Sequence, residues 1–296
     1  MVIATGFFDG VHIGHQLVLK QLIETANNRG EESLVVTFWP HPRNVLQQEA
    51  HSFRLLSSLN EKKERIYALG VDKIEVIDFD KDFSKLSAKE YLEKWIMESF
   101  SGTAIVLGYD NRVGSDISDS QDVEAIAKEL GLDVIRVDEE KSFSEGSLSS
   151  TQIRKALKEG QIEKVQSMLG EPYMLHGVVV LGNMIGRTIG FPTANMELYE
   201  PLKLVPDNGV YLVQVEVLGR NLWGVCNIGK RPTIGKGNAR TIETHIFDFD
   251  EDIYGLDIKI YFYKKLRNEI KFENLDELRG QLEKDKYLCK ELITKN

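Results

Sequence analysis

Hydrophobic and polar positions alternate differently in the two halves of the chain. Up to about residue 150, short β-branched runs alternate with stretches whose apolar residues recur at helical spacing. We expect strands at residues 2–5, 33–38, 73–77, 104–107 and 133–137, and helices at residues 13–28, 61–69, 88–99 and 122–130. This order predicts an α/β fold with a doubly wound parallel sheet, where ligands bind beyond the carboxyl ends of the strands.

The second half changes character after a helical stretch at residues 151–169. Gly170 and Pro172 end that stretch. We expect strands at residues 173–181, 209–217, 221–227, 241–247 and 258–266, then a helix at 275–292 that begins with Asn274 and Glu277 placed as a capping box. This pattern predicts an antiparallel sheet or small β-barrel with a terminal helix. The expected domains are residues 1–158 and 173–296, joined by a helical linker at 159–172.

Composition is that of an ordinary globular protein, for which a cytoplasmic enzyme is the default expectation. The 296 residues, 42% hydrophobic and 28% charged, suffice for two globular cores, and no apolar run reaches the roughly 18 residues that a membrane span needs. The net charge of −9 leaves no broad positive field for nucleic acid. Cys226 and Cys289 form no CxxC pattern, which favours a reducing compartment. We expect a cytoplasmic protein, monomeric or weakly homo-oligomeric, without nucleic-acid or membrane partners.

A turn rich in glycine and histidine follows the first strand. It contains Gly6, Phe8, Asp9, Gly10, His12 and His15. Glycines let the backbone approach a phosphate closely, and the first turn of the next helix adds N–H groups and a positive dipole end. His12 and His15, three residues apart, can point the same way at a phosphoryl group. The alternative is a capped turn with two surface histidines.

Ser150, Thr151 and Arg154 place hydroxyls and a cation at the start of another helix. An ordinary serine and threonine N-cap explains them as well. Together with the histidine turn they resemble the nucleotidylyltransferase superfamily, whose members hold ATP with such elements. The resemblance implies in-line transfer of AMP with release of pyrophosphate, helped by His12, His15 and Arg154 and without a covalent enzyme intermediate.

Two further loops indicate recognition of a flat ring. Pro40, His41 and Pro42 follow the second strand, and Asp110 follows the fourth. Aromatic residues beside rigid prolines can stack a ring, although a stiffened loop with packed aromatics fits equally well.

The second half has its own chemical cluster, which contains Gly186, Arg187, Pro192, Thr193 and Asn195. Spaced glycines suit a loop around phosphates, and Thr193 and Asn195 offer hard oxygen ligands for Mg²⁺ bound to ATP. Turns that join barrel strands are the alternative. Glu243, two residues before His245, can act from a strand as general base on an alcohol, or it is a solvated strand residue.

The order of these motifs resembles the family of bifunctional bacterial riboflavin kinases and FMN adenylyltransferases, also called FAD synthetases. The resemblance runs from about residue 6 to residue 285. It implies that the C-terminal domain uses Mg²⁺ and ATP to convert riboflavin to FMN, with Glu243 as base and Thr193 and Asn195 near the metal. The N-terminal domain then joins FMN to AMP, giving FAD and pyrophosphate. The residues implied to lie near flavin are Pro40, His41, Pro42, Asp110, Asn227, Arg231 and Arg267.

The chain departs from the family pattern on the presumed flavin side. Asparagine is usual at Phe7, and phenylalanines are usual at Asn111 and Val113. The family also usually has a short segment before the first strand. Two other hypotheses stay open: a nucleotidylyltransferase for another phosphorylated small molecule, and a noncatalytic flavin or nucleotide sensor that has kept the fold.

Overall fold

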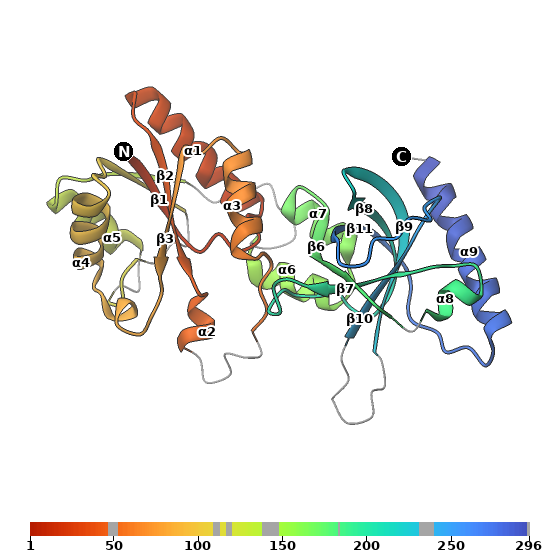
Figure 1. The fold of residues 1–296 in the computed structure, drawn as a ribbon. Coiled ribbons are helices and arrows are strands. Elements are labelled where there is room, and N and C mark those ends of the chain that lie inside the picture. Colours follow the sequence, from red (N-terminus) through yellow and green to blue (C-terminus); the bar gives the residue numbers. More distant parts are fainter. Residues whose placement is uncertain are drawn as a thin grey trace. The chain divides into compact units, whose positions relative to one another are not determined.

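The chain forms two compact units, Met1–Ser150 and Thr151–Asn296 (Figure 1). They are seen in a computed structural model that describes residues 1–46, 53–108, 113–116, 120–137, 148–182, 184–230 and 240–294. The expected boundaries at residues 158 and 173 stay predictions.

The described residues of the first unit contain a five-stranded parallel sheet in the order β3-β2-β1-β4-β5. Its strands are β1 (Val2–Thr5), β2 (Ser33–Trp39), β3 (Lys73–Asp78), β4 (Ala104–Leu107) and β5 (Asp133–Arg136). The chain leaves β1 toward β2 on one side, and β4 lies on the other side. This change of direction beside β1 is the place where open α/β sheets bind ligands.

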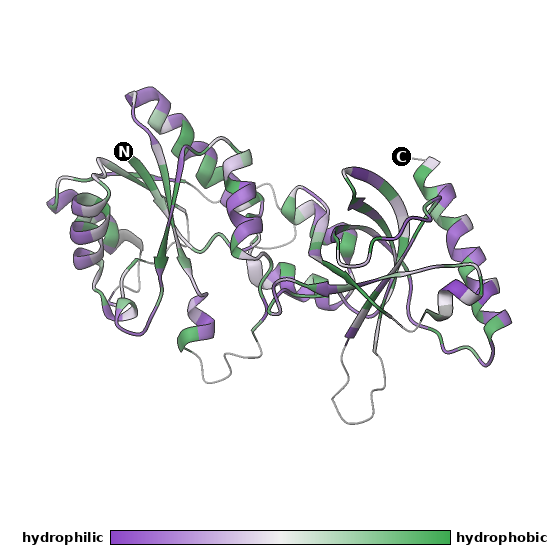
Figure 2. Cartoon of the chain, in the orientation of Figure 1, coloured by the Kyte–Doolittle hydropathy of each residue, from purple (hydrophilic) through white to green (hydrophobic). Residues whose placement is uncertain are grey.

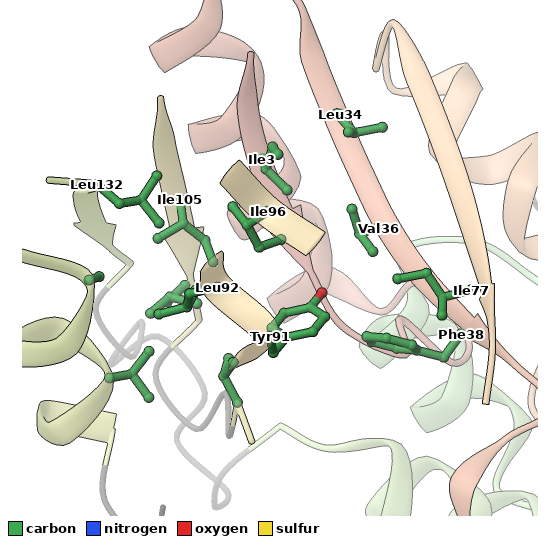
Figure 3. Packing of buried hydrophobic residues seen from close by; sticks show 14 residues of the cluster. Ile3, Leu34, Val36, Phe38, Ile77, Tyr91, Leu92, Ile96, Ile105 and Leu132 are labelled. Atoms are coloured by element: carbon green, nitrogen blue, oxygen red, sulfur yellow. The ribbon is translucent and has the colours of Figure 1, made fainter. Parts of the chain in front are cut away.

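Helices cover both faces of this sheet because its strands are apolar on both sides. The helices are α1 (Ile13–Arg29), α2 (Pro42–Leu46), α3 (Leu59–Ala68), the 3₁₀ turn η2 (Phe83–Lys85), α4 (Ala88–Tyr91), the π-helical continuation η3 (Leu92–Ser99) and α5 (Ser120–Glu129). Figure 3 shows Leu92 and Ile96 of η3 beside Ile3 and Ile105 of the sheet. Residues of α1 and α3 pack on the opposite face, so the predicted doubly wound fold is confirmed.

The second unit contains a closed barrel of six strands among its described residues, in the order β10-β7-β6-β11-β8-β9. The strands are β6 (Tyr173–Val180), β7 (Ala194–Leu198), β8 (Gly209–Val217), β9 (Arg220–Lys230), β10 (Arg240–Ile246) and β11 (Asp257–Arg267). The helices are α6 (Ser150–Lys158), α7 (Ile162–Leu169), α8 (Ile185–Thr188) and α9 (Leu275–Thr294). Val210 and Leu212 of β8 pack with Cys289 of α9, which places α9 against the outside of the barrel.

Two expectations for this half are wrong. The helix expected at 151–169 is two helices, because Gly160 takes a left-handed conformation (φ 70°) between α6 and α7. The segment expected as a glycine-rich loop up to Asn195 ends in a strand, since β7 pairs with both β6 and β10 and closes the barrel. Polar residues at Asn195 and Glu197 obscured that strand's apolar pattern.

The start of α9 agrees with its expected cap. The backbone N–H of Glu277 donates to Asn274 Oδ1 over 2.9 Å, and the Asn274 side chain donates back to Glu277 Oε1 over 3.1 Å. Figure 2 shows mainly apolar strands in the first unit and helices of mixed polarity. Within the described ranges, every helix is too short or too polar to cross a membrane. Cys226 and Cys289 are free and buried.

The core of the first unit generates a stability prediction. Replacing the fully buried Leu92 by alanine removes packed methyl groups and leaves a cavity, so the variant should lose about 2 to 5 kcal/mol of unfolding free energy. Native-state hydrogen exchange of the β1 and β4 amides measures the loss. The matched control is Leu69→Ala, whose side chain is 40% exposed. Equal effects of the two substitutions would contradict the packing shown in Figure 3.

Candidate functional site

The turn between β1 and α1 is held in an unusual backbone conformation. Phe8, Gly10 and Val11 all have positive φ, at 47°, 80° and 37°. Only Gly10 adopts such a conformation without steric strain, and for a β-branched residue such as Val11 it is a clear outlier. Strained residues of this kind persist where the surroundings over-determine them, which is common at functional sites.

Every backbone carbonyl of this turn, from Phe7 to Val11, accepts a hydrogen bond. The donors, in chain order of the carbonyls, are Lys62 Nζ (3.0 Å), Val11 N (3.0 Å), Ser150 Oγ (3.0 Å), Arg65 Nη1 (2.8 Å) and Gln16 Nε2 (2.9 Å). Three of these donors come from α3 or the start of α6, far away in sequence. They satisfy the carbonyls and so fix the path of the turn.

Asp9 anchors the same turn from its side chain. The buried carboxylate accepts hydrogen bonds from the backbone N–H groups of Leu56 and Ser57, each 3.1 Å from Oδ1. Ser57 Oγ in turn accepts from the Gly10 N–H at 3.0 Å. Gly6 also continues the β1 ladder, because its N–H donates to Val36 O over 3.1 Å.

His12 and His15 lie together at the start of α1. Their rings stack with centroids 3.6 Å apart, and His12 caps the helix by accepting the His15 N–H at its Nδ1 over 3.3 Å. Phe8 packs edge-on against His15 at 5.3 Å. The structure therefore brings together the histidines that the sequence singled out.

The electrostatic surroundings keep His15 neutral. Burial lowers its pKa well below the usual range, and the nearby charges of His12, Lys62 and Arg65 lower it further. Its Nδ1 is buried and has no hydrogen-bond partner among the described residues. A neutral imidazole has one N–H, which can be donated to a phosphate oxygen.

The other predicted residues of this unit are only partly placed. The Ser150 hydroxyl contacts the turn, whereas Thr151 and Arg154 follow on α6 in the second unit, and their joining the histidines stays a prediction. Asp110 and Asn111 lie outside the described residues. Val113 is buried in the sheet's core.

The loop after β2 forms an aromatic surface. Pro40 follows Trp39 through a cis peptide bond, and Pro42 begins α2. The His41 ring lies 5.0 Å from the Phe7 ring and 4.5 Å from the Phe53 ring. Phe7, the departure from the family pattern, is thus part of this surface, which could stack a flat ligand.

In the barrel, strand register aligns three predicted site residues. Glu243 of β10 lies directly opposite Asn195 of β7 and directly opposite Asn227 of β9. Opposite residues in antiparallel strands point to the same face with Cβ atoms about 5 Å apart. One carboxylate therefore lies between two amides, which the sequence alone did not show.

This row lies on the outer face of the barrel. Asn227 pairs with Val210, which packs against Cys289 of α9 outside the barrel. Arg267 of β11 is the next residue in the row, opposite Val210. The candidate site of the second unit is therefore on the barrel's surface, beside α9. Arg231 lies outside the described residues.

The segment before β7 is attached to β10 by His245. His245 Nδ1 lies 2.8 Å from Pro192 O, and since a carbonyl only accepts, Nδ1 carries the proton. Burial lowers the pKa of His245, which favours this neutral form. This contact attaches Pro192, the residue before Thr193, to β10. The attachment point, His245, lies two residues after Glu243. Within the same segment, Gly186 O accepts the Phe191 N–H at 2.8 Å, and Arg187 is exposed on α8.

Thr193 and Asn195 fit a role in holding Mg²⁺. A Cβ at Gly182 would lie 2.2 Å from Asn195 Nδ2, so the glycine leaves room that the Asn195 amide fills. Among the described residues, no group of three His, Cys, Asp or Glu side chains could hold a metal. Neutral hydroxyl and amide oxygens beside a single carboxylate suit a cation whose other ligands are phosphates and water.

Arg267 is tied to α9 by a buried ion pair. Its Nε donates to Asp285 Oδ1 over 3.0 Å, and its Nη2 donates to Oδ2 over 2.7 Å. Asp285 is 3% exposed and also accepts from Gln281 Nε2 at 2.8 Å. The structure therefore gives Arg267 a role in docking α9, and its expected place near flavin stays a prediction.

Sequence reasoning missed Lys62, Arg65 and Ser57, which hold the first turn. One signal was present: Lys62 lies four residues before Ile66, on the buried face of α3. Ser58 and Glu61 form a capping box that marks where this helix begins. Once the start of α3 is known, Lys62 falls on the face of the helix that points to the core. A lysine on that face is expected to have a partner inside the protein.

Comparisons with known proteins cover nearly the whole chain. The family model described as FAD synthetase matches residues 1–152, and the one described as riboflavin kinase matches residues 169–293. The chain is 37% identical over 294 residues to a bifunctional riboflavin kinase/FMN adenylyltransferase of Bacillus subtilis, covering 96% of this chain and 90% of the relative. It is 35% identical over 296 residues to the protein of that name from Escherichia coli K12, covering 99% and 92%.

A solved structure has the same fold. A crystal structure named as a macrolide-efflux protein from Streptococcus pneumoniae superposes with a TM-score of 0.89 and 30% sequence identity, covering 98% of this chain and 93% of that one. The efflux activity belongs to that protein's name. What the two chains share is the arrangement of both units' elements.

The ion pair on α9 can be tested by replacing Asp285 with asparagine. Arg267 would lose its charged partner in a half-buried position, so the second unit should lose about 2 to 4 kcal/mol of unfolding free energy. Hydrogen exchange of the α9 amides in the full chain measures this. Asp276→Asn, at an exposed position of the same helix, is the control. If both variants exchange alike, α9 does not depend on the pair.

Proposed function

The chain belongs to the family of bifunctional riboflavin kinases and FMN adenylyltransferases, and from this membership we propose where each of its two reactions takes place. It phosphorylates riboflavin with ATP to give FMN, and it transfers AMP from ATP to FMN to give FAD and pyrophosphate. We assign adenylyl transfer to a domain of residues 1–158 and riboflavin phosphorylation to residues 173–296, joined at 159–172. The order of the family models supports this assignment.

In the kinase domain, we propose Glu243 as the general base that accepts the proton of the ribityl 5′-hydroxyl of riboflavin. The amides of Asn195 and Asn227 on the neighbouring strands would orient its carboxylate and the substrate. Thr193 and Asn195 would hold Mg²⁺, which neutralises charge on the ATP phosphates when bound. His245 would keep the Pro192–Thr193 backbone in place, and Gly186 and Arg187 would lie along the phosphates.

The register that aligns Asn195, Glu243 and Asn227 is the observation that supports this site most strongly. These residues come from three strands that are distant in sequence, and each was singled out separately. A solvated strand residue, the alternative for Glu243, gives no reason for flanking amides on both neighbours.

In the adenylyltransferase domain, we propose that His12 and His15 donate N–H groups to the α-phosphate of ATP as negative charge develops there. The neutral state of His15 supports this, because its proton then serves as a donor and is not exchanged during the reaction. Ser150, Thr151 and Arg154 would bind the triphosphate from the start of α6. Gly6, Phe8, Asp9 and Gly10 would shape the turn against ATP.

The flavin would lie against the Pro40, His41 and Pro42 surface during adenylylation, and near Asn227 and Arg267 during phosphorylation. Asp110 and Arg231 complete the proposed flavin contacts. The two free cysteines fit a reducing compartment, and we place the enzyme in the cytoplasm. A monomer or weak homo-oligomer would suffice for both sites.

Glu243→Gln tests the kinase assignment. Without the general base, kcat for riboflavin phosphorylation should fall by about 10²- to 10⁴-fold, because the amide cannot accept the hydroxyl proton. Chromatographic separation of flavins after incubation with riboflavin, ATP and Mg²⁺ measures the change. The same preparation, supplied with FMN, should still form FAD. A noncatalytic sensor would lose nothing on this substitution.

His15→Asn is the reciprocal test. FAD formation from supplied FMN should fall by about 10²-fold, the loss expected for removing one preorganised donor, while riboflavin phosphorylation stays unchanged. Glu243→Gln and His15→Asn thus serve as controls for each other. If wild-type protein converts riboflavin to FMN but adenylylates a different phosphorylated compound instead of FMN, the first domain acts on another substrate.

A further inference from the structure

Lys62 is a buried charge among the side chains that hold the turn. The side chain is 4% exposed, and its Nζ donates to Phe7 O over 3.0 Å and to Thr37 Oγ1 over 2.8 Å. Both hydrogen-bond acceptors are neutral oxygens, and the negative group that acts on the ammonium group is the Asp9 carboxylate. A buried ammonium group of this kind is unfavourable in free energy compared with an apolar or amide side chain.

The ammonium group joins the two segments that leave the ligand edge of the sheet. Phe7 lies two residues beyond the end of β1, and Thr37 is near the end of β2. Arg65, three residues further along α3, holds Gly10 O over 2.8 Å. The two cations of α3 thus donate to the carbonyls of Phe7 and Gly10, which lie on either side of Phe8 and its positive φ.

We propose that Lys62 is a positioning residue of adenylyl transfer: its buried ammonium group orients the Phe7–Val11 turn and supplies fixed positive charge beside the histidines that face the phosphates. This inference rests on the proposed adenylyltransferase site. A fixed charge next to the reacting phosphates stabilises the transition state without reorganisation at the moment of reaction. The negative charge of a bound substrate would add to the compensation that the Asp9 carboxylate gives the cation in the free protein.

Electrostatics agrees with this geometry. Burial lowers the pKa of Lys62 to about 8, opposed by the Asp9 carboxylate. Lys62 in turn contributes to the lowered pKa of His15. Among the described residues, Lys62 interacts electrostatically with Asp9 on the turn and with His15 on α1, and His12 and Arg65 act on the same His15 ring. Carboxylates, imidazoles and guanidinium groups ordinarily titrate outside the range of about pH 7.5 to 9.5, so Lys62 is the member of this group expected to lose charge in that range.

The pH dependence follows from the sign of that shift. Below pH 8 the free enzyme carries the positive charge, and above it the amine becomes neutral. The wild-type kcat/KM for ATP in FAD formation should therefore fall as the pH rises through about 8, since this parameter reports the free enzyme. The phosphates of ATP and FMN, with a second pKa near 6, are fully ionised there and do not contribute.

Three variants of the full chain test the proposal. Lys62→Met should lower kcat/KM for adenylyl transfer by about 10²-fold at pH 7 and flatten the fall near pH 8. Lys62→Arg keeps the charge at all these pH values, so it should recover most of the activity and show no fall. Lys63→Met, the same change at the next position of α3, should behave as wild type. Riboflavin phosphorylation by each variant is the internal control.

A second measurement does not depend on turnover. NMR titration of the His15 ring should show a higher pKa in Lys62→Met than in wild type, because a neighbouring positive charge has been removed. An unchanged His15 pKa, or a Lys62→Arg profile that still falls near pH 8, would overturn the proposal. If Lys62→Met does not fold, the comparison of Lys62→Arg with wild type decides. Absence of FAD formation in wild type itself would instead refute the proposed function, and the His15 titration would still test Lys62.

Discussion

The left-handed turn between β1 and α1 is the constraint on which the first unit's site depends. Its positive φ values at Phe8 and Val11 are unfavourable by about 1 to 3 kcal/mol each, so the turn needs support from the rest of the unit. That support comes from α3, from the Leu56–Ser57 backbone and from Ser150, which occupy the carbonyls of the turn and the carboxylate of Asp9. The stacked histidines keep their place only because this framework fixes where α1 begins. The packing of α3 therefore also determines where the two histidines lie.

In the second unit, strand pairing positions the side chains instead of a strained turn. The residues proposed for its site lie on regular strands, and hydrogen-bonded register, instead of a strained loop, sets their spacing. Asn195, Glu243 and Asn227 are neighbours because three antiparallel strands are aligned, and the same row ends at Arg267, which is held by Asp285 of α9. The terminal helix thus contributes to the order of the row from outside the barrel. Tyr211 and Phe262 are fully buried and pack edge to face in the second unit.

Sequence patterns predicted the fold class because strands and helices of the first unit are strongly periodic and because β6 and β8 to β11 alternate clearly. They also singled out His12, His15, Glu243 and Asn195 by residue type, and the structure places the two histidines together and Glu243 opposite Asn195. The strand β7 escaped because alternation over five residues with two polar side chains is a weak signal. Lys62 and Asp285 escaped for another reason: their partners, Phe7 and Arg267, are brought to them only by tertiary packing. Local sequence patterns show which residue types could bind a ligand or transfer a proton. Long-range contacts, which the patterns do not show, determine which of these side chains are held in position.

The alignment across β7, β10 and β9 also limits how this family can vary. Side chains along a strand alternate between faces, so inserting or deleting one residue within β10 before Glu243 would turn that carboxylate into the barrel and bring Thr244 or its neighbour outward. No compensating substitution at a single position would restore the row. Changes in length therefore preserve this row only in the connections between strands, while the strands themselves can change in side chain but not in residue count. The number of residues in each of these strands is thus constrained separately from the residue type at each position.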